Sequence, residues 1–182
     1  MGLPKFLQIP SMTNIILIGM MGCGKTSVGR AVSLNASMPF FDIDSLIEAQ
    51  QKMTIPHIFE QYGESYFRVL ETEAAKSAAT CNNAVISTGG GIVLKPENMS
   101  ILKGFVIYLR CSVHQLFERT AGDSRPLLNA AKKERFKLLE ELLTVREPLY
   151  TKYSNLILDT APINELTEMI LSEYSRYKRT QY

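Results

Sequence analysis

The segment GMMGCGKT, residues 19–26, has the residue types and spacing needed to hold a chain of phosphates. It matches the pattern G-x-x-x-x-G-K-[ST], in which glycines let backbone N–H groups wrap around phosphate oxygens. Lys25 would contact the β- and γ-phosphates, and the Thr26 hydroxyl would face Mg²⁺. The alternative is a glycine-rich turn that caps a helix. The residues expected to bind a nucleoside triphosphate are Gly22, Cys23, Gly24, Lys25, Thr26 and Ser27.

Two carboxylates follow a second apolar segment, where FDID at residues 41–44 places Asp42 and Asp44 two positions apart. Side chains two apart on a strand share a face, so we expect both carboxylates to point at the same site. Asp42 would lie near Mg²⁺, through a water molecule, and Asp44 would grip a hydroxyl of the acceptor substrate. The alternatives are solvated turn residues or the N-cap of a helix.

The elements that must position these residues alternate along the chain. We expect strands at residues 14–19, 39–43, 84–88, 105–111 and 155–159. Helical patterns lie at residues 25–35, 45–51, 55–62, 64–80, 96–102, 113–120, 132–146 and 162–177. This alternation predicts an α/β fold with a parallel sheet, covered by helices on both faces, whose strand-to-helix loops meet at one edge.

Length and composition indicate one ordinary domain. The chain has 182 residues, of which 46% are apolar and 21% charged, with a net charge of +2. This balance gives no electrostatic reason to expect nucleic acid or an acidic membrane as a partner. The three cysteines lack zinc-ligand spacing and are interpreted as reduced thiols in the cytoplasm. We find no signal peptide or membrane span, and we interpret residues 1–12 as a leader, with Met12 as an alternative start.

Six motifs together carry a family resemblance, in the order GMMGCGKTSVGR, FDIDSLIE, GESYFRVLE, STGGG, RPLL and REPLY. From about residue 14 to 150 the chain resembles the shikimate kinase family, in the nucleoside monophosphate kinase-like group. The resemblance implies a three-layer P-loop kinase fold, with a five-stranded parallel sheet of strand order 2-3-1-4-5. It also implies substrate-binding helices at about 44–80 and a lid at about 120–132.

The activity implied by the resemblance is transfer of the ATP γ-phosphoryl group to the 3-hydroxyl of shikimate, a step of aromatic amino-acid biosynthesis. One Mg²⁺ ion bound with ATP is implied as cofactor, and a cytoplasmic monomer as the working form. Lys25, Asp44 and Arg125 are the catalytic residues that the resemblance implies. Asp44 would hold the acceptor hydroxyls and take the proton.

The resemblance also assigns residues to shikimate. Arg68 would bind its carboxylate with Glu71 orienting the arginine, although these residues also suit a local salt bridge three positions apart. Gly90 and Gly91 would contact the substrate through their backbones, where the alternative is a plain tight turn. Arg146 would be the second arginine on the carboxylate. The alternative for Arg146 is a favourable contact with the dipole of a helix that Pro148 stops or kinks.

The remaining assignments concern ATP. Arg125, in the segment 122–131 that we interpret as a flap, would stabilise charge on the transferring group, whereas the alternative is a solvated loop arginine. Arg119 would stack on adenine, with Pro162 as the opposite wall. The sequence departs from the family pattern at Lys52, where glycine is frequent, and at Pro56-His57.

Two other functions remain open from the sequence. One is a kinase of the same architecture that acts on another hydroxy acid, such as gluconate. The other is a non-catalytic nucleotide-binding switch. A GTPase of that kind would show the base-recognition motif N/T-K-x-D, but the nearest segment, TKYS at residues 151–154, lacks the aspartate.

Overall fold

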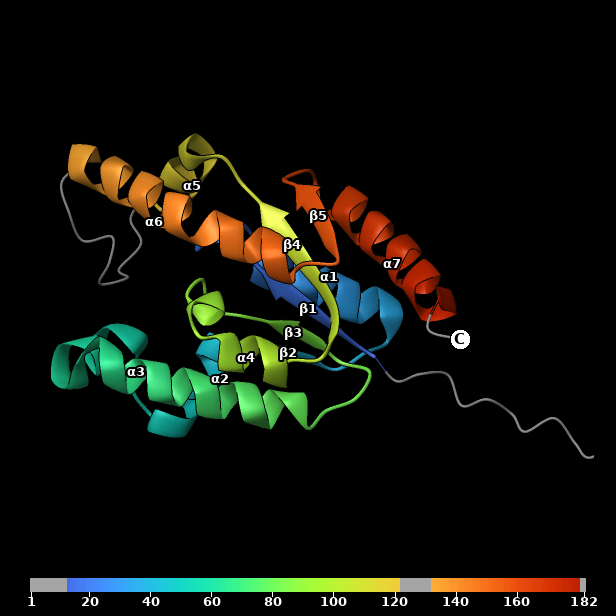
Figure 1. Cartoon of the computed structure of the whole chain (residues 1–182), viewed down its shortest axis with the longest axis horizontal. Coiled ribbons are helices and arrows are strands. Elements are labelled where there is room, and N and C mark those ends of the chain that lie inside the picture. The colour runs from blue at the N-terminus through green and yellow to red at the C-terminus, as the bar shows by residue number, and fades with distance from the viewer. Residues whose placement is uncertain (1–12, 122–131, 181–182) are drawn as a thin grey trace, which may run out of the picture.

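Five parallel strands form one sheet in a computed structural model that describes residues 13–121 and 132–180. The strand order is β2-β3-β1-β4-β5, and every neighbouring pair runs parallel (Figure 1). The predicted fold class and strand order are therefore confirmed. The strands are β1 (Asn14–Ile18), β2 (Phe40–Asp42), β3 (Val85–Ser87), β4 (Gly104–Arg110) and β5 (Leu156–Asp159).

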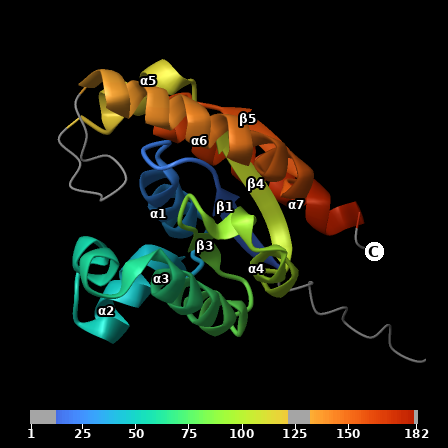
Figure 2. The ribbon, with the colours of Figure 1, turned by 60° about the vertical axis from the view of Figure 1, so that its left-hand side comes forward.

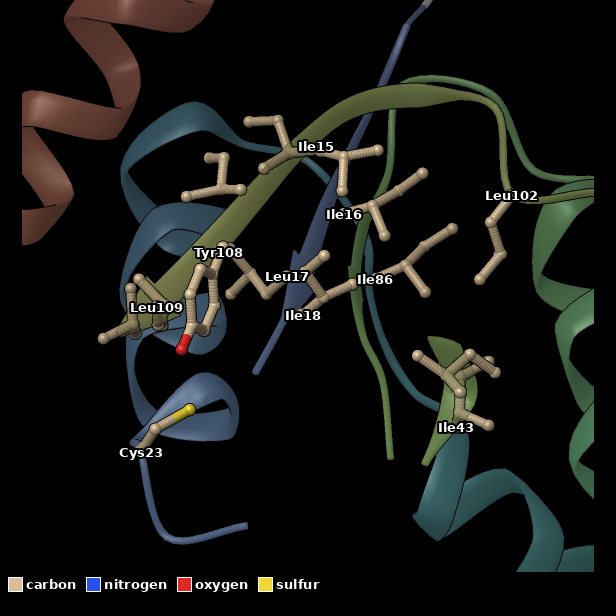
Figure 3. Close-up of a cluster of buried hydrophobic side chains, with 14 of the residues drawn as sticks. Ile15, Ile16, Leu17, Ile18, Cys23, Ile43, Ile86, Leu102, Tyr108 and Leu109 are labelled. Carbon is tan, nitrogen blue, oxygen red and sulfur yellow. The ribbon is translucent and has the colours of Figure 1, made fainter. Parts of the chain in front are cut away.

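The central strand β1 is apolar because both of its faces are covered. All five of its residues are buried, as expected for an inner strand of a parallel sheet. Figure 3 shows the side chains of Ile15 to Ile18 with Ile86 of β3 and Tyr108 of β4 in the same apolar cluster. The one polar residue, Asn14, accepts a hydrogen bond from Ala84 N–H at 2.9 Å and donates one to the Cys81 carbonyl at 2.8 Å.

Helices cover both faces of the sheet (Figures 1 and 2). On one face, α1 (Lys25–Ala36) packs against α7 (Ile163–Thr180), so the chain's first and last helices are neighbours. The opposite face carries α3 (Ile55–Ala79), α4 (Pro96–Ile101) and α6 (Lys132–Tyr153). The shorter helices α2 (Ile43–Gln51) and α5 (Val113–Arg119) pack against α3 and α6. In the described parts of the chain, no helix is long and apolar enough to cross a bilayer.

Helix α3 is broken at Gly63, as the two predicted helices at 55–62 and 64–80 require. Gly63 has φ 77° and ψ 174°, a backbone conformation that residues with a Cβ rarely adopt. At the preceding turn, Lys52 ends α2 in the left-handed conformation, with φ 51° and ψ 35°. Glycine adopts this conformation without strain, so the left-handed backbone at Lys52 is consistent with the glycine that the family resemblance implies there.

Two local predictions were wrong. Helix α6 does not end at residue 146, as predicted, but continues through Pro148 to Tyr153. Its last turns pack Leu149, Tyr150 and Tyr153 against the core, and this tertiary packing outweighs one lost hydrogen bond. Strand β2 ends at Asp42, so Asp44 lies in the first turn of α2 and shares no strand face with Asp42.

The 3-10 turn η1 (Ile92–Leu94) was not predicted. The predicted leader and most of the predicted lid lie outside the described residues.

The substitution Gly63→Ala should destabilise the fold because of the backbone conformation alone. A Cβ at Gly63 would meet no atom within 4 Å, so steric collision contributes nothing. We expect the free energy of unfolding to fall by about 1–3 kcal/mol, measured by urea denaturation. Ser65→Ala, at an exposed helical position two residues further along, is the control and should change stability little. An unchanged Gly63→Ala variant would contradict the assigned backbone strain.

Candidate active site

A cavity of about 490 Å³ opens where β1, β2 and β3 end. Ligands bind at this edge in parallel α/β sheets, because the strand-to-helix loops gather there. The cavity brings together most of the predicted site residues, from both the nucleotide and the acceptor halves. Those lining it are Gly22, Gly24, Lys25, Thr26, Ser27, Asp42, Asp44, Arg68, Glu71, Gly90, Gly91 and Arg146.

The phosphate-binding half is the loop that enters α1. Gly24 occupies the N-cap position, where it provides no side-chain hydrogen bond, and the first turn of α1 contains no acidic residue. The N–H groups at this end are therefore not capped by a side chain. An anion placed at this end would be stabilised by them and by the helix dipole.

The Lys25 ammonium lies inside the same loop. Its Nζ donates to the carbonyl oxygens of Gly19 at 2.9 Å and Met20 at 2.8 Å, and lies 3.7 Å from Cys23 Sγ. The lysine is only 7% exposed, so these carbonyls replace its lost hydration. The positive charge is thus held at the centre of the loop that would surround the phosphates.

Thr26 and Asp42 form the predicted metal-facing pair. The Thr26 hydroxyl donates to Asp42 Oδ2 at 2.7 Å, and Asp42 Oδ1 accepts from the Ser45 N–H at 3.2 Å as the N-cap of α2. A hydroxyl and a carboxylate oxygen are donors that suit Mg²⁺, which keeps water and phosphate oxygens as its other ligands. Among the described residues no three His, Cys, Asp or Glu side chains cluster as a metal site, and a nucleotide-bound Mg²⁺ does not need such a cluster.

The glycine turn that follows β3 lies between the two halves of the site. A Cβ built on Gly90 would lie 3.1 Å from Met21 N of the phosphate loop and 3.5 Å from Arg146 Nη1. A Cβ on Gly89 would lie 2.8 Å from Asp44 Oδ1 and 2.9 Å from Glu71 Oε1. A side chain at either position would require these neighbouring atoms to shift, so the glycines let the groups of the site lie close to the backbone of the turn.

Arg68 is surrounded by carboxylates. Its Nη1 donates to Glu71 Oε2 at 2.9 Å, while Nε and Nη2 donate to Glu64 Oε1 at 3.2 and 2.8 Å. The predicted pairing with Glu71 is present, and sequence reasoning missed the pairing with Glu64, whose signal was the four-residue spacing. Burial raises the pKa of Glu71 above its usual range, and Asp44 adds to this rise, whereas Arg68 and Arg146 oppose it.

Arg146 reaches the site from α6. It is 4% exposed, and its Nη1 donates to the Gly90 carbonyl at 3.3 Å. The hydroxyl of Tyr150, one turn further along α6, donates to the same carbonyl at 2.5 Å. Because α6 continues to Tyr153, Arg146 lies outside its last turn, where the dipole acts weakly on a side chain. Tyr150 was not predicted as a site residue, although it is the last letter of REPLY.

An apolar wall completes the acceptor half and was also missed. Ile55, Pro56, Phe59 and Phe67 line the cavity on either side of the Gly63 break. The rings of Phe59 and Phe67 lie 4.8 Å apart, centroid to centroid. The sequence signal was present in the apolar spacing around Gly63, but that spacing predicts a buried helix face equally well.

Three predicted residues in the described part of the chain, Cys23, Arg119 and Pro162, do not line the cavity. Cys23 is a buried residue of the phosphate loop. Arg119 donates from Nη1 to Cys111 Sγ at 3.5 Å, and this thiol contacts Thr160 Oγ1 at 3.0 Å. The loop before α7, which carries Pro162, is thereby linked to Arg119. Arg125 lies outside the described residues.

Comparisons with known proteins agree with this geometry. The family model for shikimate kinase matches residues 21–175. The shikimate kinase of Ralstonia nicotianae is 41% identical over 168 residues, which cover 90% of this chain and 87% of that protein. Shikimate kinase from Acinetobacter baumannii, solved in complex with shikimate, superposes with a TM-score of 0.88 at 34% identity and covers 93% of this chain and 96% of that one.

A structural match at much lower sequence identity shows only a common fold. A gluconokinase from Sinorhizobium meliloti superposes with a TM-score of 0.60 at 16% identity, covering 94% of this chain and 96% of that one. The matched motifs, the common fold and the identity over most of the chain therefore lead to one conclusion: this chain belongs to the shikimate kinase family.

Proposed function

We propose that this chain transfers the γ-phosphoryl group of ATP to the 3-hydroxyl of shikimate, giving shikimate 3-phosphate and ADP on the route to aromatic amino acids. The observation that carries the proposal is a single cavity in which a phosphate loop faces two arginines across the Gly90 backbone. The two arginines suit an anionic acceptor, and membership of the family supports the choice of shikimate. We expect it to act as a cytoplasmic monomer.

The phosphate half contributes charge and position. Phosphoryl transfer passes through a loose, in-line transition state, so catalysis consists largely of placing the reactants and neutralising charge. Lys25 binds the β- and γ-phosphates after it exchanges the loop carbonyls for phosphate oxygens, and Ser27 and the loop amides hold the rest of the chain. Mg²⁺, held near Thr26 and Asp42, supplies further neutralisation of the phosphate oxygens when bound. Arg119 stacks on adenine, and Arg125 stabilises the transferring group.

The acceptor half fixes the ring of shikimate, and the two helical segments at about 44–80 supply most of it. Arg68 and Arg146 bind the carboxylate through charge-assisted hydrogen bonds. Glu71 orients Arg68, Gly90 and Gly91 present backbone to the substrate, and the rings of Phe59 and Phe67 cover its carbon skeleton. Asp44 holds the acceptor hydroxyls and accepts the proton of the 3-hydroxyl as transfer proceeds.

An ADP-release assay with shikimate and gluconate tests the proposal and its rivals. We expect ADP release that depends on shikimate and is at background with gluconate, because gluconate offers no ring for the apolar wall. Lys25→Ala should abolish release, since it removes the ammonium that contacts the Gly19 and Met20 carbonyls inside the phosphate loop. A folded, ATP-binding protein with no activity on shikimate would favour the switch, and activity on gluconate would favour the other kinase.

Arg146→Ala should mainly raise the KM for shikimate. One charge-assisted contact to the carboxylate is lost, which corresponds to an increase of about 10- to 100-fold, while the phosphate half stays intact. Steady-state kinetics at saturating ATP would measure the KM and kcat separately. The control Arg176→Ala removes an arginine that pairs with Glu173 on the surface of α7 and should leave both constants unchanged. An unchanged KM in Arg146→Ala would refute the assigned role.

Glu71→Gln should show that the buried carboxylate of Glu71 lowers the free energy of unfolding. The raised pKa means that folded Glu71 holds its proton more tightly than the unfolded chain does. Stability therefore falls as the pH rises from the unfolded pKa to the folded one, and stays lower above it. Below about pH 4 Glu71 is protonated and therefore neutral in both the folded and the unfolded chain.

We therefore expect the variant to gain stability relative to the parent protein between about pH 4 and pH 7, measured by urea unfolding across that range. Glu73→Gln, at an exposed position of the same helix, is the control. A difference between Glu71→Gln and the parent that does not change with pH would contradict the raised pKa.

A further inference from the structure

The guanidinium of Arg68 has a neighbour on every edge that carries N–H groups. Glu64 covers the edge formed by Nε and Nη2, and Glu71 accepts from Nη1. A Cβ built on Gly91 would lie 2.2 Å from Nη1 and 2.6 Å from both Cζ and Nη2, so the guanidinium lies close against the Gly91 backbone. A substrate carboxylate that forms two parallel hydrogen bonds with Arg68 must displace one of these neighbours.

Glu64 is the neighbour most easily displaced. Its side chain is 54% exposed, whereas that of Glu71 is 1% exposed, and the Gly91 backbone is fixed by the turn after β3. Glu64 also directly follows the break at Gly63, so it begins the second helical part of α3. A carboxylate at the start of a helix is stabilised by the N-terminal dipole and by water after it leaves the arginine.

The charges near the glycine turn also favour displacement of Glu64 by a substrate carboxylate. Two arginines, Arg68 and Arg146, approach the glycine turn together with the carboxylates of Glu64, Glu71 and Asp44. An anionic substrate binds better once one of these negative charges has moved into solvent. Glu64 is the one that can do so without breaking a buried contact.

We infer that Glu64 is an internal competitor for the carboxylate of the acceptor and thereby a specificity-determining residue. This inference rests on the proposed function, in which Arg68 binds that carboxylate. An acid that offers only a carboxylate gains too little to replace Glu64. An acid that also places hydroxyls near Asp44 and a carboxylate near Arg146 gains enough binding energy to replace Glu64. The ion pair of Glu64 with Arg68 therefore selects against anions that carry only a carboxylate.

The test is Glu64→Gln, which keeps the shape of the side chain and removes its charge. We expect the KM for shikimate to fall about two- to fivefold, the range for an exposed ion pair, and competitive inhibition by benzoate, a carboxylate without hydroxyls, to strengthen at least as much. Glu73→Gln is the matched control, because Glu73 lies on the same helix and pairs with Lys76 at 2.9 Å. It should change neither constant.

Two outcomes would overturn the inference. A higher KM would mean that Glu64 holds Arg68 in its binding position, and an unchanged KM and benzoate inhibition would mean that no competition exists. Glu64→Ala provides a second variant, and thermal melting of both verifies folding. The effect should also vanish in an Arg68→Gln background, which has no cation at this position to pair with Glu64, and a persistent effect would show that the charge acts without Arg68.

Titration calorimetry with shikimate and benzoate separates this inference from the proposed function. Absence of ADP release with shikimate would refute the proposed function. The change in binding between the parent protein and Glu64→Gln would still decide the role of Glu64.

Discussion

One constraint shapes the site: charged side chains and the phosphate loop lie close against three consecutive residues after β3 that have no side chains. Gly89 allows two carboxylates to approach the turn, Gly90 allows the phosphate loop and Arg146 to approach, and Gly91 allows the guanidinium of Arg68 to lie against the backbone. The Gly90 carbonyl is then fixed by both Arg146 and Tyr150. Because this turn separates the nucleotide half from the acceptor half, its position sets the distance over which a phosphoryl group would move.

Each cation of the site is held by acceptor groups of the protein. Lys25 donates hydrogen bonds to loop carbonyls, Arg68 pairs with two glutamates and Arg146 donates to the Gly90 carbonyl. Such pairs keep cations folded into a cavity where unpaired charges would be expensive. Binding is therefore an exchange of partners, and the affinity for a ligand is the difference between its contacts and those it replaces.

Elements that are determined by residues close together in the sequence could be predicted from the sequence. The phosphate loop and the break at Gly63 follow from glycines and apolar runs, whereas the sheet order was implied only by the family resemblance. Contacts that depend on three dimensions were not: the Gly90 carbonyl shared by Arg146 and Tyr150 joins residues 56 and 60 positions apart. Asp44 was placed on a strand because periodicity cannot tell where β2 gives way to α2. The extension of α6 past Pro148 depends on packing that no local rule describes.

The distribution of the site over the fold explains how one scaffold serves different acceptors. The phosphate loop lies between β1 and α1, whereas the residues that line the proposed acceptor half come from α2, α3, the glycine turn and α6. The likeness to a gluconokinase at 16% identity extends to the fold alone, so the sheet and its helices do not select the acceptor. In the proposed function, selection resides in a few charged side chains that α3 and α6 carry. The break at Gly63 is central to it, because it lets one helix contribute both the apolar wall and the arginine with its counter-ions.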